Sequence, residues 1–205
     1  TFNPQDCSNC LWAFARQKHV IVPPQIQRVA VGLVTRASSM TFRIKSMEIA
    51  NIFWSAGQLE IKIVANDCRN KLLSCVCRVA PMLTPQHIAM ILHGASAIQF
   101  NQSTAQALQT QVENKISHFN PRCISNCLEG TKYFQLNIER KEQQQQSAST
   151  RSCIINIVHI LLNKSNQIIQ DFDCRDITSI VSFLEYIQNE QINLINVSTE
   201  LKRIV

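Results

Sequence analysis

Apolar residues recur along the chain at the i, i+3, i+4 spacing that places them on one face of a helix. A stretch with this spacing begins at Cys7, and altered copies begin at Ile49, Ile88 and Ile124, at steps of 42, 39 and 36 residues. A period of this length is typical of stacked supersecondary units. We therefore predict an all-α fold, an α-solenoid of about four to five helix-turn-helix repeats of 36–42 residues.

A second amphipathic pattern follows each of the first three copies. It opens at Pro23-Pro24 after the first copy, and it covers residues 59–79 after the second and 104–118 after the third. Neither helix of such a unit can bury its apolar stripe alone. Neighbouring units are therefore expected to pack side by side.

Three of the copies are preceded by a signal for the start of a helix. The pairs are Asn3-Pro4, Thr84-Pro85 and Asn120-Pro121. Asn and Thr side chains accept hydrogen bonds from the free N–H groups of the first turn, and proline is favoured at its first position. We expect a helix to begin at each pair.

The fourth unit is interrupted by a polar, glutamine-rich stretch, Glu142 to Thr150, which has nothing to bury. We expect repeats 1–4 over residues 1–136, a flexible insertion over 137–150, and C-terminal helices with a cap over 151–205. A weaker fifth copy is predicted to begin near Asp176. Residues 190–204 would then form its partner helix.

Composition supports a buried core made of helices. The chain is 45% apolar but has only 4 Gly and 6 Pro, which disfavours sandwiches and barrels with many tight turns. No window approaches 18 consecutive apolar residues, so we expect no membrane insertion. The chain opens at Thr1 without a targeting segment, which indicates a processed or partial protein. Nine cysteines without a regular framework favour buried thiols in a reducing or organellar compartment.

The formal charge lies entirely on the first half of the chain. Residues 1–103 hold 10 Lys and Arg against 4 Asp and Glu, whereas residues 104–205 hold 10 of each. Stacked helices would set the basic residues in a row that can follow a phosphate backbone, although each one alone is equally compatible with a solvated face. The candidate phosphate-binding residues are Arg16, Lys18, Arg28, Arg36, Arg43, Lys45, Lys62, Arg69, Lys71 and Arg78.

The segment from Asn9 to Ala15, Asn-Cys-Leu-Trp-Ala-Phe-Ala, and its echo from Asn51 to Ala56 resemble the repeats of a known family. They are similar to the helices of octotricopeptide, heptatricopeptide and FAST-kinase-like repeat proteins. The resemblance implies an α-solenoid that binds organellar RNA, and mitochondrial ribosomes are among the assemblies that such proteins join. The third and fourth copies carry His93 and Glu129 where the first two have tryptophan.

The Cys7-x-x-Cys10 pair has the spacing of a zinc or redox site. Ile49 and Ile88 stand at the position of Cys7, and Ile52 and Ile91 stand at the position of Cys10 and Cys127. Positions that isoleucine can also fill favour buried thiols over zinc or a disulfide. Trp12 and Trp54 stand in the apolar motif, so packing between repeats is favoured over stacking on bases. The five histidines lack zinc spacing, and His93 is expected to be half-buried.

Nothing in the chain indicates catalysis, because the sequence has no phosphate-binding glycine loop, no nucleophile elbow and no close carboxylate pair in an apolar setting. We therefore expect a protein that is not an enzyme and needs neither a cofactor nor a metal.

The predicted function is non-catalytic RNA binding through the basic first half, in the mitochondrial matrix. An rRNA-stabilising component of a divergent mitochondrial ribosome is favoured. Asn9, Asn51 and Gln58 are the candidates for base contacts, and the neutral second half is expected to contact other proteins. The alternatives are a scaffold subunit of a mitochondrial membrane complex and a free organellar transcript factor, and the salt dependence of binding separates the scaffold from the RNA binders.

Overall fold

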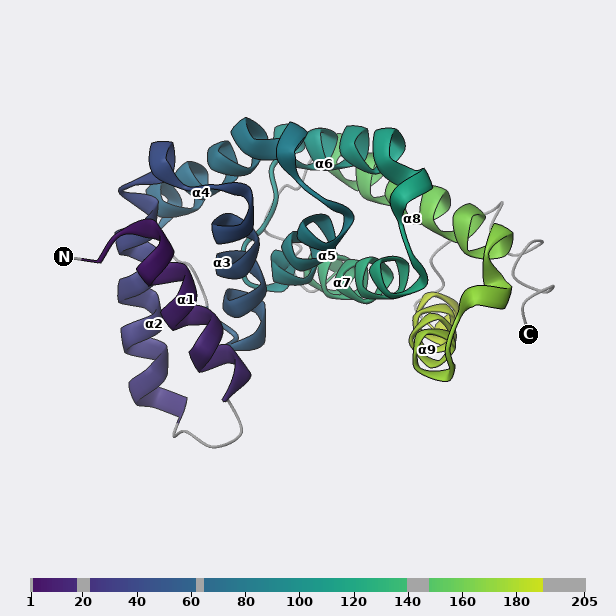
Figure 1. Ribbon diagram of the computed structural model, residues 1–205, viewed down its shortest axis with the longest axis horizontal. Helices are drawn as coiled ribbons and strands as arrows, with labels where there is room; N and C mark the ends of the chain where they lie inside the picture. Colours follow the sequence, from purple (N-terminus) through teal and green to yellow (C-terminus); the bar gives the residue numbers. More distant parts are fainter. Residues whose placement is uncertain (1, 18–22, 62–64, 140–147, 190–205) are drawn as a thin grey trace.

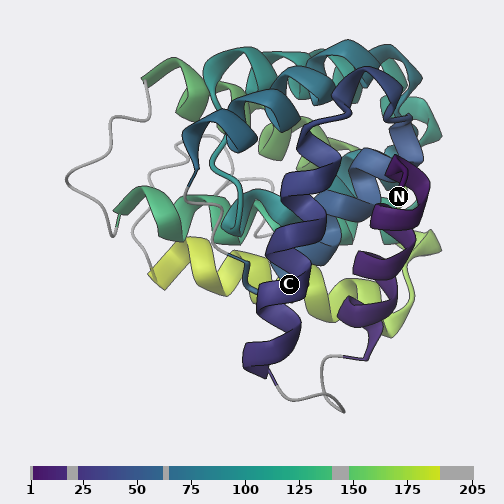
Figure 2. The ribbon, with the colours of Figure 1, turned by 90° about the vertical axis from the view of Figure 1, so that its left-hand side faces the viewer.

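A computed structural model describes residues 2–17, 23–61, 65–139 and 148–189. Every regular element in these ranges is a helix, and none of the described residues lies in a strand. The helices alternate along the chain between two layers that run the length of the molecule (Figures 1 and 2). The predicted all-α repeat fold is confirmed.

Layer A contains the first helix of each repeat. Its members are α1 (Pro4–Arg16), α3 (Ser46–Gln58), α5 (Pro85–His93), α7 (Pro121–Glu139) and α9 (Cys174–Asn189). Each packs on the next in the series. Layer B contains the second helices, which also pack on one another in chain order. They are α2 (Pro23–Ser38), α4 (Asn66–Val79), α6 (Gln102–Lys115) and α8 (Ala148–Gln167).

A short 3₁₀ turn joins each described layer B helix to the next layer A helix. These turns are η1 (Thr41–Arg43), η2 (Ala80–Met82), η4 (Ile116–His118) and η5 (Ile169–Asp171). One apolar residue and one capping position follow each turn. Ile44, Leu83 and Phe119 occupy the apolar position after η1, η2 and η4 and are buried, so these three boundaries are anchored in the core. Phe172, after η5, is half-buried.

The predicted helix starts are confirmed, and their hydrogen bonds show why they work. Asn3 accepts from the N–H of Asp6 at 3.0 Å, and the Asp6 carboxylate accepts from the Asn3 N–H at 2.9 Å, which completes a capping box. Thr84 accepts from the N–H of its third helical residue at 3.3 Å. Asn120 accepts from the Cys123 N–H at 2.8 Å.

The fifth copy of the motif is also a layer A helix, α9, which packs on α7. The Asp173 carboxylate accepts a hydrogen bond from the Asp176 N–H at 2.8 Å, so Asp173 caps this helix as Asn3 caps the first. The prediction of a copy near Asp176 therefore holds. Its expected partner helix, residues 190–204, lies outside the described residues.

The predicted helix over 59–79 is wrong in its first part. The N–H of Ile61 donates to the Ala56 carbonyl at 2.9 Å, and Glu60 has a left-handed φ of 52°, so the chain reverses directly after α3. Leu59 and Ile61 are both buried at this reversal. Their apolar character reflects a buried turn rather than a helix, and α4 begins only at Asn66.

The glutamine-rich insertion is shorter than predicted at both ends. Helix α7 continues to Glu139, and α8 already begins at Ala148 with Thr150 buried. Residues 140–147 lie outside the described residues. Because Thr150 is a polar residue, the sequence pattern groups it with the preceding polar stretch, although the structure buries its side chain in α8.

Two glycines allow the layer A helices to approach each other closely. A Cβ atom at Gly94 would collide with the Phe53 carbonyl group of α3, and one at Gly130 would lie 2.6 Å from the backbone nitrogen of His93. Gly94 and Gly130 occupy the same position in successive copies of the motif. The close approach of α5 to α3 and of α7 to α5 therefore depends on the absence of a side chain at this position.

Candidate nucleic-acid interface

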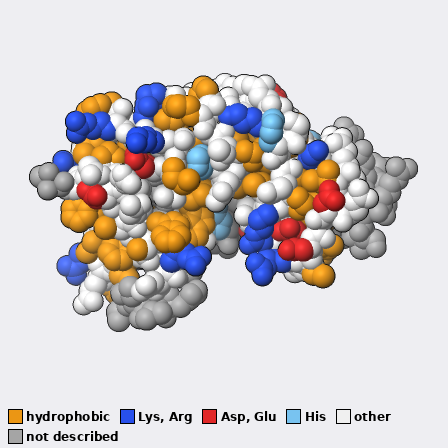
Figure 3. All heavy atoms as spheres, in the orientation of Figure 1, with side chains coloured by type: hydrophobic (Ala, Val, Ile, Leu, Met, Phe, Trp, Pro, Cys, Tyr) orange, Lys and Arg blue, Asp and Glu red, His pale blue; other side chains and the backbone are white. Residues whose placement is uncertain are grey.

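The predicted basic residues lie on several surfaces rather than in one row. Arg16 ends α1, whereas Arg43 and Lys45 precede α3. Since α1 and α3 run in the same direction and span about 20 Å each, these groups lie at opposite ends of layer A (Figure 1). On the face seen in Figure 3, Lys and Arg side chains form separate groups divided by apolar and uncharged atoms.

Two of the predicted residues, Arg36 and Arg78, bond backbone carbonyls of the preceding repeat boundary. The Arg36 guanidinium donates to the Phe2 carbonyl at 3.3 Å. That of Arg78 donates to the carbonyls of Thr41 at 2.7 Å and Ile44 at 2.6 Å. These hydrogen bonds tie α2 to the segment before α1 and α4 to η1 and the residue after it, so neither cation is directed only towards solvent.

Lys115 makes the same contact one repeat later, although it was not among the predicted site residues. Its ammonium group donates to the carbonyls of Pro81 at 2.8 Å and Leu83 at 2.5 Å. Phe2, Ile44 and Leu83 each stand directly before the cap of a layer A helix. We call Arg36, Arg78 and Lys115 the repeat clamps.

Two further predicted residues have partners on or near their own helix. Lys71 pairs with Asp67 at 2.6 Å, one turn away on α4. Arg69 donates to Asn66 at 2.9 Å and to Gln99 at 3.4 Å. Lys18 and Lys62 lie outside the described residues. The predicted residues without a described ion pair or hydrogen bond to their cationic group are Arg16, Arg28, Arg43 and Lys45.

Two of these four arginines and lysines lie over exposed aromatic rings. The Arg16 guanidinium is 5.5 Å from the centre of the Trp12 ring, and Trp12 is 43% exposed. The Arg43 guanidinium is 5.6 Å from the Phe42 ring, which is 74% exposed. We call these the two arginine–aromatic pairs.

The exposure of Trp12 contradicts the predicted packing between repeats. Trp54, at the same motif position, is half-buried against the core as expected. Trp12 differs because α1 is the first helix of layer A, and no preceding helix covers that face within the described residues. Phe42 was not predicted as a site residue. In the sequence, it stands out only as an aromatic residue directly before Arg43.

The residues proposed for base contacts all lie on layer A, where Asn9 is exposed and Asn51 and Gln58 are half-buried. Asn9 is exposed, one turn before Trp12, and Asn51 is half-buried at the equivalent place on α3. Gln58 and His93 form an amide–imidazole hydrogen bond at 2.5 Å that joins two repeats. His93 is half-buried, as predicted. Gln58 is thus engaged within the protein, and Asn9 is the most accessible of the three.

The cysteines at isoleucine positions of the motif lie where a core residue is expected. Cys7 and Cys127 are fully buried, whereas Cys10 is partly exposed at the open side of α1. Burial raises the pKa of the Cys7 and Cys127 thiols, since the thiolate would lose its hydration. Within the described residues, no three His, Cys, Asp or Glu side chains are grouped so as to hold a metal ion.

His87 completes the cap of α5 in place of the more usual glutamate. Its Nδ1 accepts a hydrogen bond from the Thr84 N–H at 3.3 Å, so this nitrogen must be unprotonated. Burial, together with the nearby Lys115 ammonium group, lowers the pKa of His87. Both effects favour the unprotonated form that the cap requires.

We expect acidification to weaken the fold through His87. The unfolded chain binds this proton more tightly, so the stabilisation is complete above the unfolded pKa of about 6.5 and decreases as the pH falls towards the folded pKa. When the pH is lowered from neutral to mildly acidic, the free energy of unfolding measured with urea should fall less for His87→Gln than for the unchanged protein. His118→Gln, at an exposed histidine, is the control. Equal pH dependence in all three proteins would contradict this role.

No described helix combines the length and the apolar character needed to cross a membrane. Comparison with models of known protein families gives no match. Comparison with curated proteins gives none either. What the chain does is therefore inferred from its own geometry.

Proposed function

We propose that this protein binds single-stranded RNA without catalysis, through the exposed side of α1 and the turn before α3. The observation that supports it best is the presence of the two arginine–aromatic pairs in the basic half of the chain. Bases of single-stranded RNA stack on exposed aromatic rings, and arginine adds attraction to phosphates or to the base plane.

The surroundings of the arginine–aromatic pairs are compatible with this binding mode. Asn9 lies exposed one turn from Trp12 and offers both a donor and an acceptor for a base edge. Arg28 and Lys45 are exposed and can neutralise phosphates. The repeat clamps are occupied with backbone carbonyls, so we assign phosphate contacts to Arg16, Arg28, Arg43 and Lys45.

A place in a divergent mitochondrial ribosome, as a component that stabilises rRNA, is the more specific form of the proposal. It is supported by the resemblance to organellar helical-repeat proteins and by the neutral second half, which leaves a surface for protein neighbours.

Direct binding to short single-stranded RNA, followed by fluorescence anisotropy, tests the proposal. We expect Trp12→Ala to weaken binding at least about fivefold, because one stacked base contributes about 1–3 kcal/mol. The dissociation constant should rise with salt with a logarithmic slope of about 0.7 for each phosphate contacted. Arg43→Glu should both weaken binding and reduce this slope.

The matched control is Arg151→Glu, which reverses an exposed arginine on α8 in the neutral half of the chain. It should change the affinity far less than Arg43→Glu. Thermal unfolding should show that Trp12→Ala is still folded at the temperature of the binding assay. An equal loss of RNA affinity for Arg43→Glu and Arg151→Glu would contradict the assignment of a phosphate contact to Arg43. The absence of saturable RNA binding at low salt would contradict the proposed function itself.

A protein scaffold is the second candidate, and exposed apolar residues on α2 favour it. Val29 and Val31 are 52% and 43% exposed on this outermost helix of layer B. Apolar side chains on an edge helix suit contact with another protein. Complexes held by such a surface should show little salt dependence, in contrast to RNA binding.

A further inference from the structure

The first helix of layer B, α2, presents an exposed row of residues at the end of the molecule that faces the viewer in Figure 2. Val29, Gly32 and Arg36 follow one another at spacings of three and four residues, so they share one face of α2. Val29 is 52% exposed, and Gly32 is exposed as well. The hydrogen bond from Arg36 to the Phe2 carbonyl brings Phe2, which is 50% exposed, to the same end of α2.

The equivalent surface of the second repeat is polar. Counted back from the clamp on each helix, Lys71 of α4 stands at the position of Val29. Ser74 stands at the position of Gly32. Both residues of α4 are exposed, and Lys71 pairs with Asp67 on the same helix. This surface of α4 therefore has the polar character that suits water, whereas that of α2 does not.

Gly32 differs from the other three glycines of the chain. A Cβ atom at Gly57, Gly94 or Gly130 would meet the backbone of a neighbouring layer A helix, so close packing accounts for each of them. A Cβ atom at Gly32 would have no atom within 4 Å. Glycine inside a helix is less stable than alanine, so Gly32 weakens α2 without any gain within the described part of the chain. Its use elsewhere in this fold points to a helix backbone that approaches α2 from outside.

We infer that this face of α2 docks an acidic amphipathic helix of another protein, with the two backbones closest at Gly32. Val29 supplies apolar contact beside the crossing point. Charge decides the sign of the partner, because α2 carries Arg28 and Arg36 but neither Asp nor Glu. Carboxylates beside the apolar stripe of the partner would be attracted to these arginines. The inference rests on α2 as the protein-binding surface of the second candidate function and does not depend on RNA binding through α1.

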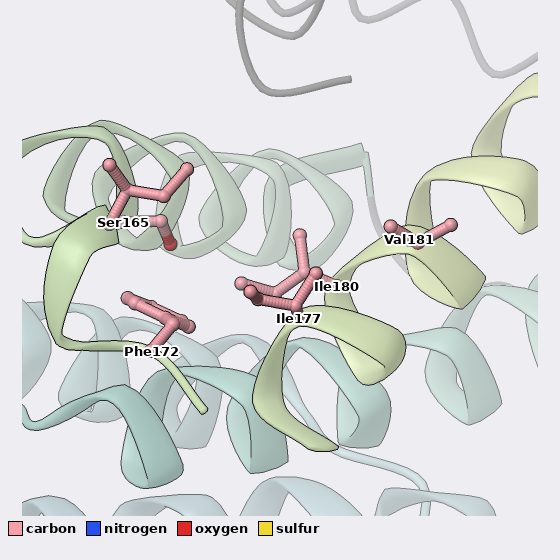
Figure 4. A pocket seen from close by; sticks show the side chains of 6 residues that line it. Ser165, Phe172, Ile177, Ile180 and Val181 are labelled. Carbon is pink, nitrogen blue, oxygen red and sulfur yellow. The ribbon is translucent and has the colours of Figure 1, made fainter. Parts of the chain in front are cut away.

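A second copy of the chain is the alternative occupant, and its surfaces fit α2 less well. Two α2 helices face to face would bring arginines together without any carboxylate between them. An apolar pocket between α8 and α9, lined in part by Phe172, Ile177 and Val181, is a further apolar surface of the described chain (Figure 4). A pocket is filled by a protruding side chain, whereas the centre of the α2 row is a glycine.

Fluorescence anisotropy with synthetic helical peptides and the full chain tests the inference. The probe is a peptide of about 20 residues, long enough to form a helix, with an alanine and leucine face flanked by glutamates. Its counterpart carries lysines in place of the glutamates. We expect saturable binding of the glutamate peptide, and binding of the lysine peptide at least about threefold weaker. Gly32→Ala should weaken binding of the glutamate peptide at least about fivefold, because the added methyl group keeps the helices apart.

Loss of folding cannot explain such an effect, since Gly32→Ala should make the chain alone more stable. Ser74→Ala, at the equivalent exposed position of α4, is the matched control and should leave the peptide affinity unchanged. Equal affinity for the two peptides, no saturable binding of either, or unchanged affinity in Gly32→Ala would overturn the inference.

Two further measurements identify a different occupant. If Gly32→Ala weakens binding of single-stranded RNA as much as binding of the peptide, the face belongs to the RNA site. If sedimentation velocity shows self-association of the unchanged chain that Gly32→Ala abolishes, the face belongs to a second copy. Either result would also overturn the inference.

Discussion

Gly94→Ala should lower the free energy of unfolding by about 3 kcal/mol or more, although it adds a single methyl group. A Cβ atom at this position would collide with the carbonyl oxygen of Phe53 and lie 2.6 Å from its carbonyl carbon. Phe53 is fully buried, so the backbone of α3 cannot move aside without disturbing the core. Urea unfolding followed by circular dichroism measures the effect.

The collision is the only reason for this expected loss. Gly94 has φ −75° and ψ −5°, which alanine adopts readily, so backbone strain contributes nothing. Gly130→Ala should behave similarly, because its Cβ would meet the backbone of Leu92 and His93.

Gly32→Ala is the matched control, since a Cβ there has open space on every side. It lies within α2 and is exposed, so alanine should raise stability by about 0.5–1 kcal/mol through better helix propensity. The free energy of unfolding should therefore fall for Gly94→Ala and rise for Gly32→Ala. A loss at Gly32 equal to that at Gly94 would show that close packing of layer A is not the cause.

Lys115→Met should lower the free energy of unfolding by about 1.5–3 kcal/mol, which is the usual contribution of hydrogen bonds to a charged group. Methionine keeps the apolar stem but leaves the carbonyls of Pro81 and Leu83 without their donor. Burial already lowers the pKa of Lys115, which indicates that its ammonium group is partly withdrawn from water. Urea unfolding again provides the measurement.

Lys71→Met is the comparison for the clamp. Lys71 pairs with Asp67 on the exposed surface of one helix, and such pairs contribute about 0.2–1 kcal/mol at most. Arg78→Met should resemble Lys115→Met, since Arg78 bonds the carbonyls of Thr41 and Ile44. If the clamp variants were as stable as Lys71→Met, the basic residues at the repeat boundaries would have no structural role.

The role of a basic residue in this fold depends on its neighbours. In sequence, Arg43 and Arg78 look alike, and both belong to the excess positive charge of the first half. In the fold, Arg43 lies over an exposed ring, whereas Arg78 bonds backbone carbonyls of the preceding boundary. The proposed phosphate contact is therefore assigned to Arg43, whose guanidinium has no described hydrogen bond.

The repeat fold could be predicted because it follows from local chemistry that each unit repeats. The apolar spacing from Ile49 to Ala56 defines one helical face, and Asn3 and Thr84 cap helices wherever they precede a suitable first turn. These features involve residues within one or two turns of each other. The helices of the motif, their order and the residues at which they begin can therefore be predicted from the sequence.

The remaining features depend on residues about one repeat apart, which no local pattern records. The clamps join residues 32–34 positions apart. Trp12 and Trp54 have the same motif position, but among the described helices only the one that carries Trp54 has another layer A helix before it. Exposure and charge pairing arise from how the helices stack, so tertiary structure alone decided which aromatic and basic residues face solvent.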